Sequence, residues 1–181
     1  MTYRILSSAF VAYATVAFTA VTSVAPAQAQ PEEREAPRYL AAMKAEFDAL
    51  RITHVCEVET SARARCSFRQ RGAQSQQEFE IQLVYSDEND TVYFYISRYL
   101  FLAADGEHTD RVLRRLMEVN WELLIGKFEW DSADGEVRLS MTMNTDSNFD
   151  RRTFRSMVRS IARVADHYYG PLSRLIPSET E

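Results

Sequence analysis

The chain has 181 residues, of which 46% are hydrophobic and 26% are charged, and its formal net charge is -5. A negative charge opposes adhesion to phosphate backbones and anionic lipid, so these numbers argue against a nucleic acid partner. The length is enough for one compact domain with a buried core.

The amino terminus has the pattern of a signal peptide. Arg4 precedes an apolar run from Ile5 to Val24, and the small residues Ala27 and Ala29 follow. A basic start, an apolar middle and small residues at this spacing predict that residues 1–29 are a cleaved signal peptide. The apolar run is also long enough for an uncleaved membrane anchor, and the sequence leaves this alternative open.

Cleavage after Ala29 would leave residues 30–181 in the periplasm or outside the cell. This part has a formal net charge of -6, because Arg4 is the only charged residue that is removed. It contains no second apolar run of membrane-spanning length, so we expect no membrane contact after cleavage. Residues 30–37 are rich in charge and proline, typical of a flexible lead-in. We expect a single domain over residues 38–176 and a short tail at 177–181.

Helical spacing of apolar residues opens this domain, over residues 38–51. Alternating residues then predict strands, with one set of side chains on the side that faces the core. These core-facing positions are Ala64, Cys66 and Phe68, then Phe79, Ile81, Leu83 and Tyr85, then Val92, Phe94 and Ile96. A polar turn at residues 86–90 separates the last two strands, which should pair as antiparallel neighbours.

The second half of the domain is predicted to contain a helix, a hairpin and a last helix. Thr109 is a candidate cap for a helix that runs to Ile125, and Gly126 should end that helix in a left-handed conformation. A hairpin is predicted from residues 127–130 and 136–143, and a last helix runs from Asp150 to about Gly170. The predicted fold is therefore α+β, in the order α-ββββ-α-ββ-α, with the helices packed on one face of an antiparallel sheet.

The two cysteines fit opposite positions of the first hairpin. If strands at residues 54–59 and 63–70 turn about Ser61, then Cys56 faces Cys66 and His54 faces Phe68 on the same side. An even number of cysteines in an exported chain predicts a disulfide between Cys56 and Cys66. Two buried thiols are the alternative. No C-x-x-C spacing supports a redox-active pair.

A search for catalytic chemistry finds no familiar motif. The sequence lacks G-x-S-x-G, H-E-x-x-H, a Walker loop and G-x-G-x-x-G, so we predict no catalytic residue and no cofactor. The histidines at 54, 108 and 167 are not at metal-ligand spacing, and the acidic turns lack the glycine and glutamate of a calcium loop, so no metal is predicted. Carboxylates that converge only in the fold are not excluded.

Aromatic and basic residues point to a contact surface. Tyr93 and Tyr95 alternate with core-facing residues, so they should stand on the opposite side of the sheet, as should Arg63, Arg65 and Arg69. If the helices cover only one face, these five residues form a surface suited to a protein partner. A merely solvated charged face is the alternative. We also expect Trp121 and Trp130 to anchor the second helix to the following hairpin.

The carboxyl-terminal half resembles the YbjN-type bacterial domain family of sensory transduction regulators. The features that carry the resemblance are a helix ending in Asn120 and Gly126, a strand starting at Lys127 and Phe128, an Asp-Gly turn, and a last helix with Asp166 before Pro171-Leu172. It covers residues 39–172 as a pattern of hydrophobic and turn positions. The resemblance implies a fold similar to type III secretion chaperones, frequent dimerisation and no established catalytic residues. A signal peptide and a cysteine pair depart from the family pattern.

These observations predict an exported, non-enzymatic protein-binding domain, chaperone-like or regulatory, that contacts protein segments through its sheet and forms a homodimer. A small periplasmic enzyme or small-ligand carrier is the alternative. A cavity with a strongly perturbed carboxylate would favour that alternative. A purely structural envelope protein is a third candidate.

Overall fold

The computed structural model describes residues 35–146 and 148–176. The described residues all belong to one compact unit. The predicted signal peptide, most of the predicted lead-in and the predicted tail lie outside the described residues. No helix in the described part of the chain is long and apolar enough to cross a membrane.

The described residues form three helices and six strands, which follow one another in the predicted order. They are α1 (Leu40–Ala49), β1 (His54–Thr60), β2 (Arg63–Arg71), β3 (Glu78–Ser86), β4 (Thr91–Phe101), α2 (Thr109–Glu122), β5 (Lys127–Trp130), β6 (Glu136–Asn144) and α3 (Arg151–Ser173). All strand pairs are antiparallel, in the spatial order β1-β2-β3-β4-β6-β5. The α+β fold class is confirmed.

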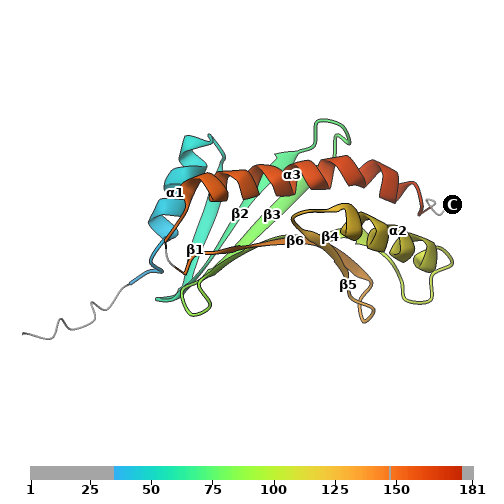
Figure 1. Cartoon of the computed structure of the whole chain (residues 1–181), viewed down its shortest axis with the longest axis horizontal. Helices are drawn as coiled ribbons and strands as arrows, with labels where there is room; N and C mark the ends of the chain where they lie inside the picture. Colours follow the sequence, from blue (N-terminus) through green and yellow to red (C-terminus); the bar gives the residue numbers. More distant parts are fainter. Residues whose placement is uncertain (1–34, 147, 177–181) are drawn as a thin grey trace, which may run out of the picture. The chain divides into compact units, whose positions relative to one another are not determined.

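The buried core lies between one face of the sheet and the helices. Figure 1 shows α1 and α3 side by side on this face. The alternating residues of β2, β3, β4 and β6 pack there against apolar stripes of all three helices, with Phe47, Val112 and Phe154 each 0% exposed. Helices therefore cover one face of the sheet, as the strand alternation predicts.

A change of register in β4 adds two residues to the core. The pairing with β6 shifts between Ile96 and Leu100, where Arg98 has a positive φ of 48°. After this bulge, both Tyr99 and Leu100 are buried, and the Tyr99 hydroxyl donates to the Ala165 carbonyl at 2.8 Å. The hydrogen bond satisfies a buried hydroxyl and ties α3 to the sheet.

The first hairpin has the predicted register. His54 pairs with Phe68, and Cys56 pairs with Cys66, to which it is joined by a disulfide. The bond links the edge strand β1 to β2. It therefore holds in place a strand that has a neighbour on one side only.

The helix ends differ from the sequence prediction in three places. Thr109 is the first residue of α2 rather than its cap, and its hydroxyl donates to the Ala103 carbonyl at 2.6 Å. The helix ends at Glu122 instead of Ile125, because Leu123 is extended, and Gly126 leads into β5 with a φ of 96°. Helix α3 runs through Gly170 and Pro171 to Ser173. Proline is tolerated there because the exposed end of a helix can lose one hydrogen bond.

Candidate protein-contact surfaces

The five predicted contact residues lie on the outer sheet face, the side opposite the helices. Arg63, Arg65 and Arg69 alternate along β2, and Tyr93 and Tyr95 alternate along β4. The side chains of this face are less exposed to solvent than the strand alternation predicts. Arg63 and Arg69 are exposed and Tyr93 is half-buried, but Tyr95 is only 8% exposed.

Tyr95 is covered by its neighbours on the same face. The Tyr93 and Tyr95 rings stack with centroids 5.3 Å apart, and the Arg138 guanidinium lies 5.3 Å from the centre of the Tyr95 ring. Arg65 donates to the Tyr95 hydroxyl at 2.8 Å and to Glu59 at 3.0 Å. These contacts join the tyrosines and arginines into one platform, in which the arginines, more than the tyrosines, meet solvent.

Glu129, on the edge strand β5, also belongs to this face, and the sequence analysis did not include it among the contact residues. Its carboxylate accepts hydrogen bonds from the Tyr93 hydroxyl at 3.0 Å and the Ser140 hydroxyl at 2.7 Å, and pairs with Lys127 at 2.7 Å. Burial opposes ionisation of Glu129, but these hydrogen bonds outweigh it and lower its pKa. Period-two alternation would have placed Glu129 on the outer face, since Phe128 faces the core.

A shallow hollow of about 330 Å³ lies beside Glu129, at the β5-β6 end of the outer face. Tyr93 and Trp130 supply its aromatic lining, and Glu136 and Arg138 supply charge. The hollow therefore offers apolar and polar contacts together.

The prediction that Trp121 anchors α2 to the following hairpin is wrong. Trp121 is 91% exposed and so does not anchor α2 to the hairpin. Trp130 is half-buried against the core, and its indole nitrogen donates to the Leu102 carbonyl at 3.0 Å. The hairpin is instead held to α2 by the side chain of Asn120, which exchanges two hydrogen bonds with the backbone of Phe128.

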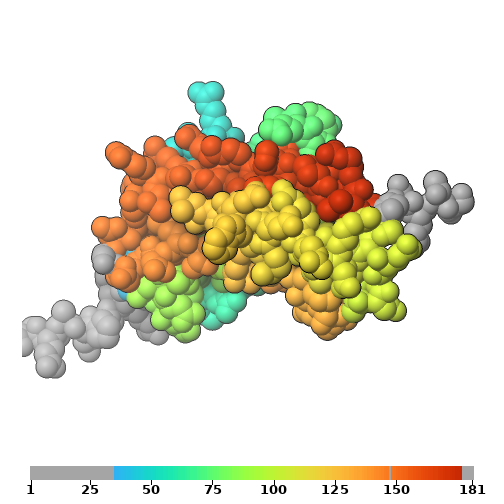
Figure 2. All heavy atoms as spheres, turned by 45° about the vertical axis from the view of Figure 1, so that its right-hand side comes forward, coloured from blue at the N-terminus to red at the C-terminus, as the bar shows by residue number. Residues whose placement is uncertain are grey.

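The exposed apolar residues around Trp121 form what we call the α2 patch. It consists of Met117, Trp121, Leu124 and Ile125, which are 68%, 91%, 96% and 49% exposed. Met117 and Trp121 are one helical turn apart, on the side of α2 opposite its buried residues Val112, Leu116 and Val119. In Figure 2 the atoms of α2, in yellow, lie at the surface with no other described element over them.

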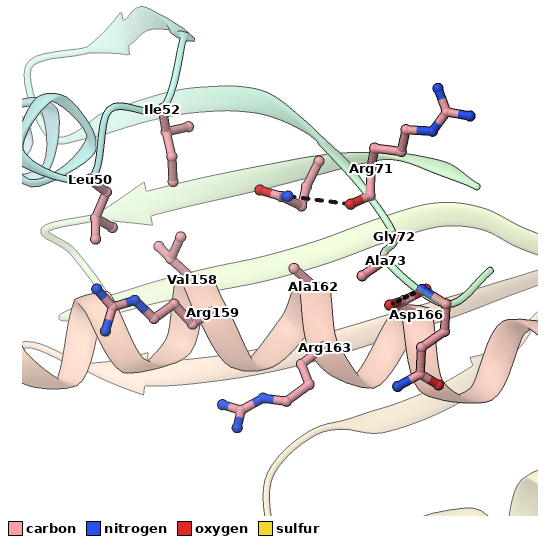
Figure 3. A pocket seen from close by; sticks show the side chains of 12 residues that line it. Leu50, Ile52, Arg71, Gly72, Ala73, Val158, Arg159, Ala162, Arg163 and Asp166 are labelled. Atoms are coloured by element: carbon pink, nitrogen blue, oxygen red, sulfur yellow. Dashed lines mark hydrogen bonds between the residues drawn. The ribbon is translucent and has the colours of Figure 1, made fainter. Parts of the chain in front are cut away.

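A third surface is a groove of about 520 Å³ between α3 and the end of β2. Figure 3 shows Leu50 and Ile52 facing Val158 and Ala162 across this groove. At its far end the Asp166 carboxylate accepts hydrogen bonds from the β2-β3 loop, from the backbone nitrogens of Gln74 and Ser75 and from the Ser75 hydroxyl. Although burial opposes ionisation of Asp166, these bonds lower its pKa.

The three histidines of the described residues lie on different elements. His54, in β1, has its Nδ1 3.1 Å from the Ile52 carbonyl, while His108 is the N-cap of α2 and His167 lies within α3. Within residues 35–146 and 148–176, no group of three or more His, Cys, Asp or Glu side chains is placed to hold a metal ion. The carboxyl groups whose pKa is shifted are Glu129, Asp150 and Asp166, and each shift is downward. They accept hydrogen bonds as carboxylates and are poor general acids at neutral pH.

Comparisons with known proteins identify the family. No curated protein matches the chain significantly. Solved structures that are similar to it include the following two. The crystal structure of YbjN from E. coli, titled "a putative transcription regulator", is 12% identical, with a TM-score of 0.49 over 73% of this chain and 92% of that one. The crystal structure of the ExsC-ExsE complex is 18% identical, with a TM-score of 0.39 over 56% of this chain and 71% of that one.

The family model of YbjN, described as "Putative bacterial sensory transduction regulator", matches residues 73–173, which is more than half of the chain. The match runs from the β2-β3 loop to the end of α3 and so includes the segment on which the resemblance was based. The chain belongs to the YbjN family.

Proposed function

We propose that this chain is an exported, non-enzymatic protein-binding domain that acts as a homodimer and binds a protein segment on its outer sheet face. The observation that carries the proposal is the exposure of the α2 patch. A tryptophan that is 91% exposed beside a leucine that is 96% exposed keeps a large apolar area in water. Contiguous apolar area of this kind marks a protein contact. The regulatory description of the family agrees with a binding role.

The charges of α2 favour a second copy of the chain as the partner of the α2 patch. Arg114 precedes the patch on the same side of the helix and has no side-chain partner in the described part of the chain, whereas Glu118 and Glu122 follow Met117. Two copies of α2 packed antiparallel would bring Arg114 of each copy close to the acidic end of the other. Such an isologous contact buries Trp121 and pairs the charges at the same time.

Sedimentation equilibrium of residues 30–181 tests the homodimer. We expect a dimer that W121E/L124E converts to a folded monomer, because two carboxylates would be buried without partners. The matched control is Val55→Glu, an exposed apolar residue of β1, which should leave the dimer intact. Arg114→Glu should weaken the dimer, and the exchange R114E/E122R should restore it. A wild type that is monomeric at all concentrations contradicts the proposal.

The outer sheet face is the surface on which we place the bound protein segment. No described helix covers it, its tyrosine and arginine platform is held rigid by hydrogen bonds, and the hollow beside Tyr93 can take a side chain. Rigid aromatic and arginine side chains contribute most to protein interfaces because little entropy is lost when they bind.

Site-specific photocrosslinking in the cell envelope tests this placement. A photoreactive residue at Thr142 or Arg63, on the outer sheet face, should give one discrete adduct. The same residue at Lys44, which is exposed on α1, is the matched control and should not give that adduct. Equal adducts from all three positions, or an adduct from Lys44 alone, would refute binding at the sheet.

A further inference from the structure

The arginine side chains of the described residues differ in whether they pair with other groups of the protein. Several are paired within the protein: Arg151 and Arg155 bind the buried Glu46, and Arg63 and Arg65 bind Glu59. Others have no hydrogen bond or ion pair in the described part of the chain, and five of these gather at one end of the sheet. They are Arg51, Arg69, Arg71, Arg159 and Arg163.

These five arginines line two neighbouring hollows. Arg71, Arg159 and Arg163 border the groove between α3 and β2, and Arg51 and Arg69 border a hollow of about 620 Å³ at the start of β1. The two hollows adjoin, because Ile52 and Gln70 line both. We call the pair of hollows the arginine groove.

The acidic residues of the arginine groove do not neutralise this charge. Its linings contain only Asp166 and Glu80. Asp166 already accepts hydrogen bonds from three donor groups of the β2-β3 loop. Glu80 pairs across the strands with Arg69 but makes no ion pair with it in this structure. A concentration of unpaired positive charge in a chain of net charge -5 marks a surface that attracts an acidic partner.

The floor of the groove is apolar, and this restricts the class of partner. Figure 3 shows Leu50, Ile52, Val158 and Ala162 pointing toward one another, while the Arg159 side chain reaches toward Leu50. The guanidinium groups of Arg71 and Arg163 point away from the floor, to its outer sides. A ligand that fills the site must therefore place apolar groups in the centre and negative charge at the borders.

We propose that the arginine groove binds an acidic, amphipathic protein segment, with leucine-like side chains on the floor and carboxylates on the arginines. A phosphodiester backbone would leave the floor empty and would meet the negative charge of the rest of the chain. A flat anionic membrane would reach the arginines but not the recessed floor. This site is distinct from the α2 patch, and of the five contact residues of the outer sheet face it includes only Arg69.

Fluorescence anisotropy with a labelled peptide of alternating glutamate and leucine tests the proposal on residues 30–181. We expect saturable binding that weakens as salt is added, because exposed charge pairs are screened. Replacing leucine by serine in the peptide should weaken binding at least about tenfold, since a buried apolar side chain contributes more than this. Replacing glutamate by lysine should abolish it.

Variants of α3 locate the site. R159E/R163E should weaken binding at least about tenfold, because two attractive charges become repulsive. R152E/R174E is the matched control, since it changes the same charge in the first turn and at the C-cap of the same helix, outside the linings, and should bind as the wild type does. Ala162→Phe should block the floor, with an unchanged circular dichroism spectrum as evidence of folding.

Any of three results would overturn the proposal. The glutamate-leucine peptide could fail to bind, its serine version could bind as tightly as the leucine version, or R152E/R174E could weaken binding as much as R159E/R163E. Single-stranded DNA or phosphatidylserine vesicles could instead bind more tightly than the peptide, through Arg159 and Arg163. The partner would then be a nucleic acid or a membrane and not a protein segment. The variant W121E/L124E should bind the peptide as the wild type does, because the groove does not include α2. This titration therefore tests the groove independently of the homodimer.

Discussion

At the scale of residues, the carboxylate of Asp166 stabilises the β2-β3 loop through charge-assisted hydrogen bonds. Asp166 lies on α3, yet it is bound by the backbone of the loop more than ninety positions away in the chain. Backbone N–H groups that have no strand partner need an acceptor, and an ionised carboxylate is a strong one. The same carboxylate closes one end of the arginine groove, so that a stability residue also shapes a candidate binding site.

Replacing Asp166 by asparagine tests this role. We expect Asp166→Asn to lose about 1–2 kcal/mol of unfolding free energy at neutral pH, because one charged acceptor of several hydrogen bonds becomes neutral. The pKa of Asp166 is lower in the folded state, so its contribution is present above the ordinary carboxyl pKa and is lost as the pH falls through the folded value. Urea unfolding should therefore show a smaller difference at pH 3 than at pH 7.

Asp105→Asn, in the exposed loop before α2, serves as the control for this measurement. Asp105 has no partner in the described part of the chain, and its substitution should change the free energy of unfolding by less than about 0.5 kcal/mol at either pH. A difference for Asp166→Asn that does not shrink in acid would mean that the side-chain shape, rather than its charge, stabilises the loop.

At the scale of elements, α2 is an amphipathic helix with a second apolar side. Its inner residues pack on the sheet, and its outer residues Met117 and Trp121 face solvent. Helical periodicity identifies both sides as apolar but does not distinguish which one is covered within the chain. The two tryptophans of the segment therefore have opposite roles, which a stability measurement can separate.

Truncation of the two tryptophans should give unequal effects. Trp130→Ala should cost about 2–4 kcal/mol, because a half-buried ring and its hydrogen bond to Leu102 are lost. Trp121→Ala should change the unfolding free energy of the monomer by less than about 0.5 kcal/mol. Differential scanning calorimetry in the R114E background, at a protein concentration at which that variant is monomeric, measures both. A large loss for Trp121→Ala there would contradict its exposed position.

At the scale of the whole molecule, the disulfide agrees with the export that we propose. The bond between Cys56 and Cys66 joins the edge strand to the sheet, and disulfides persist in the oxidising compartments outside the cytoplasm. A short closed loop of this kind limits the unfolded chain and so stabilises the folded one.

The double variant C56S/C66S should lower the unfolding free energy by about 2–3 kcal/mol. Chemical denaturation of the oxidised wild type, the reduced wild type and the variant measures the effect, and the last two should agree. Mass spectrometry of the chain from the periplasmic fraction should show an amino terminus at Gln30 and a mass two hydrogens below that of the reduced form. A full-length, reduced chain in the cytoplasm would contradict export.

The local rules of the chain were enough to determine the element order, the β1-β2 register and the cysteine pair. Each follows from spacing between near neighbours: period-two alternation places Cys56 opposite Cys66, and polar turns set the hairpins. The tertiary structure decided which apolar side of α2 is covered, how far Tyr95 is buried under Arg138, and which arginines gather around Ile52. These features depend on contacts between residues far apart in the chain, about which hydrophobic periodicity carries no information.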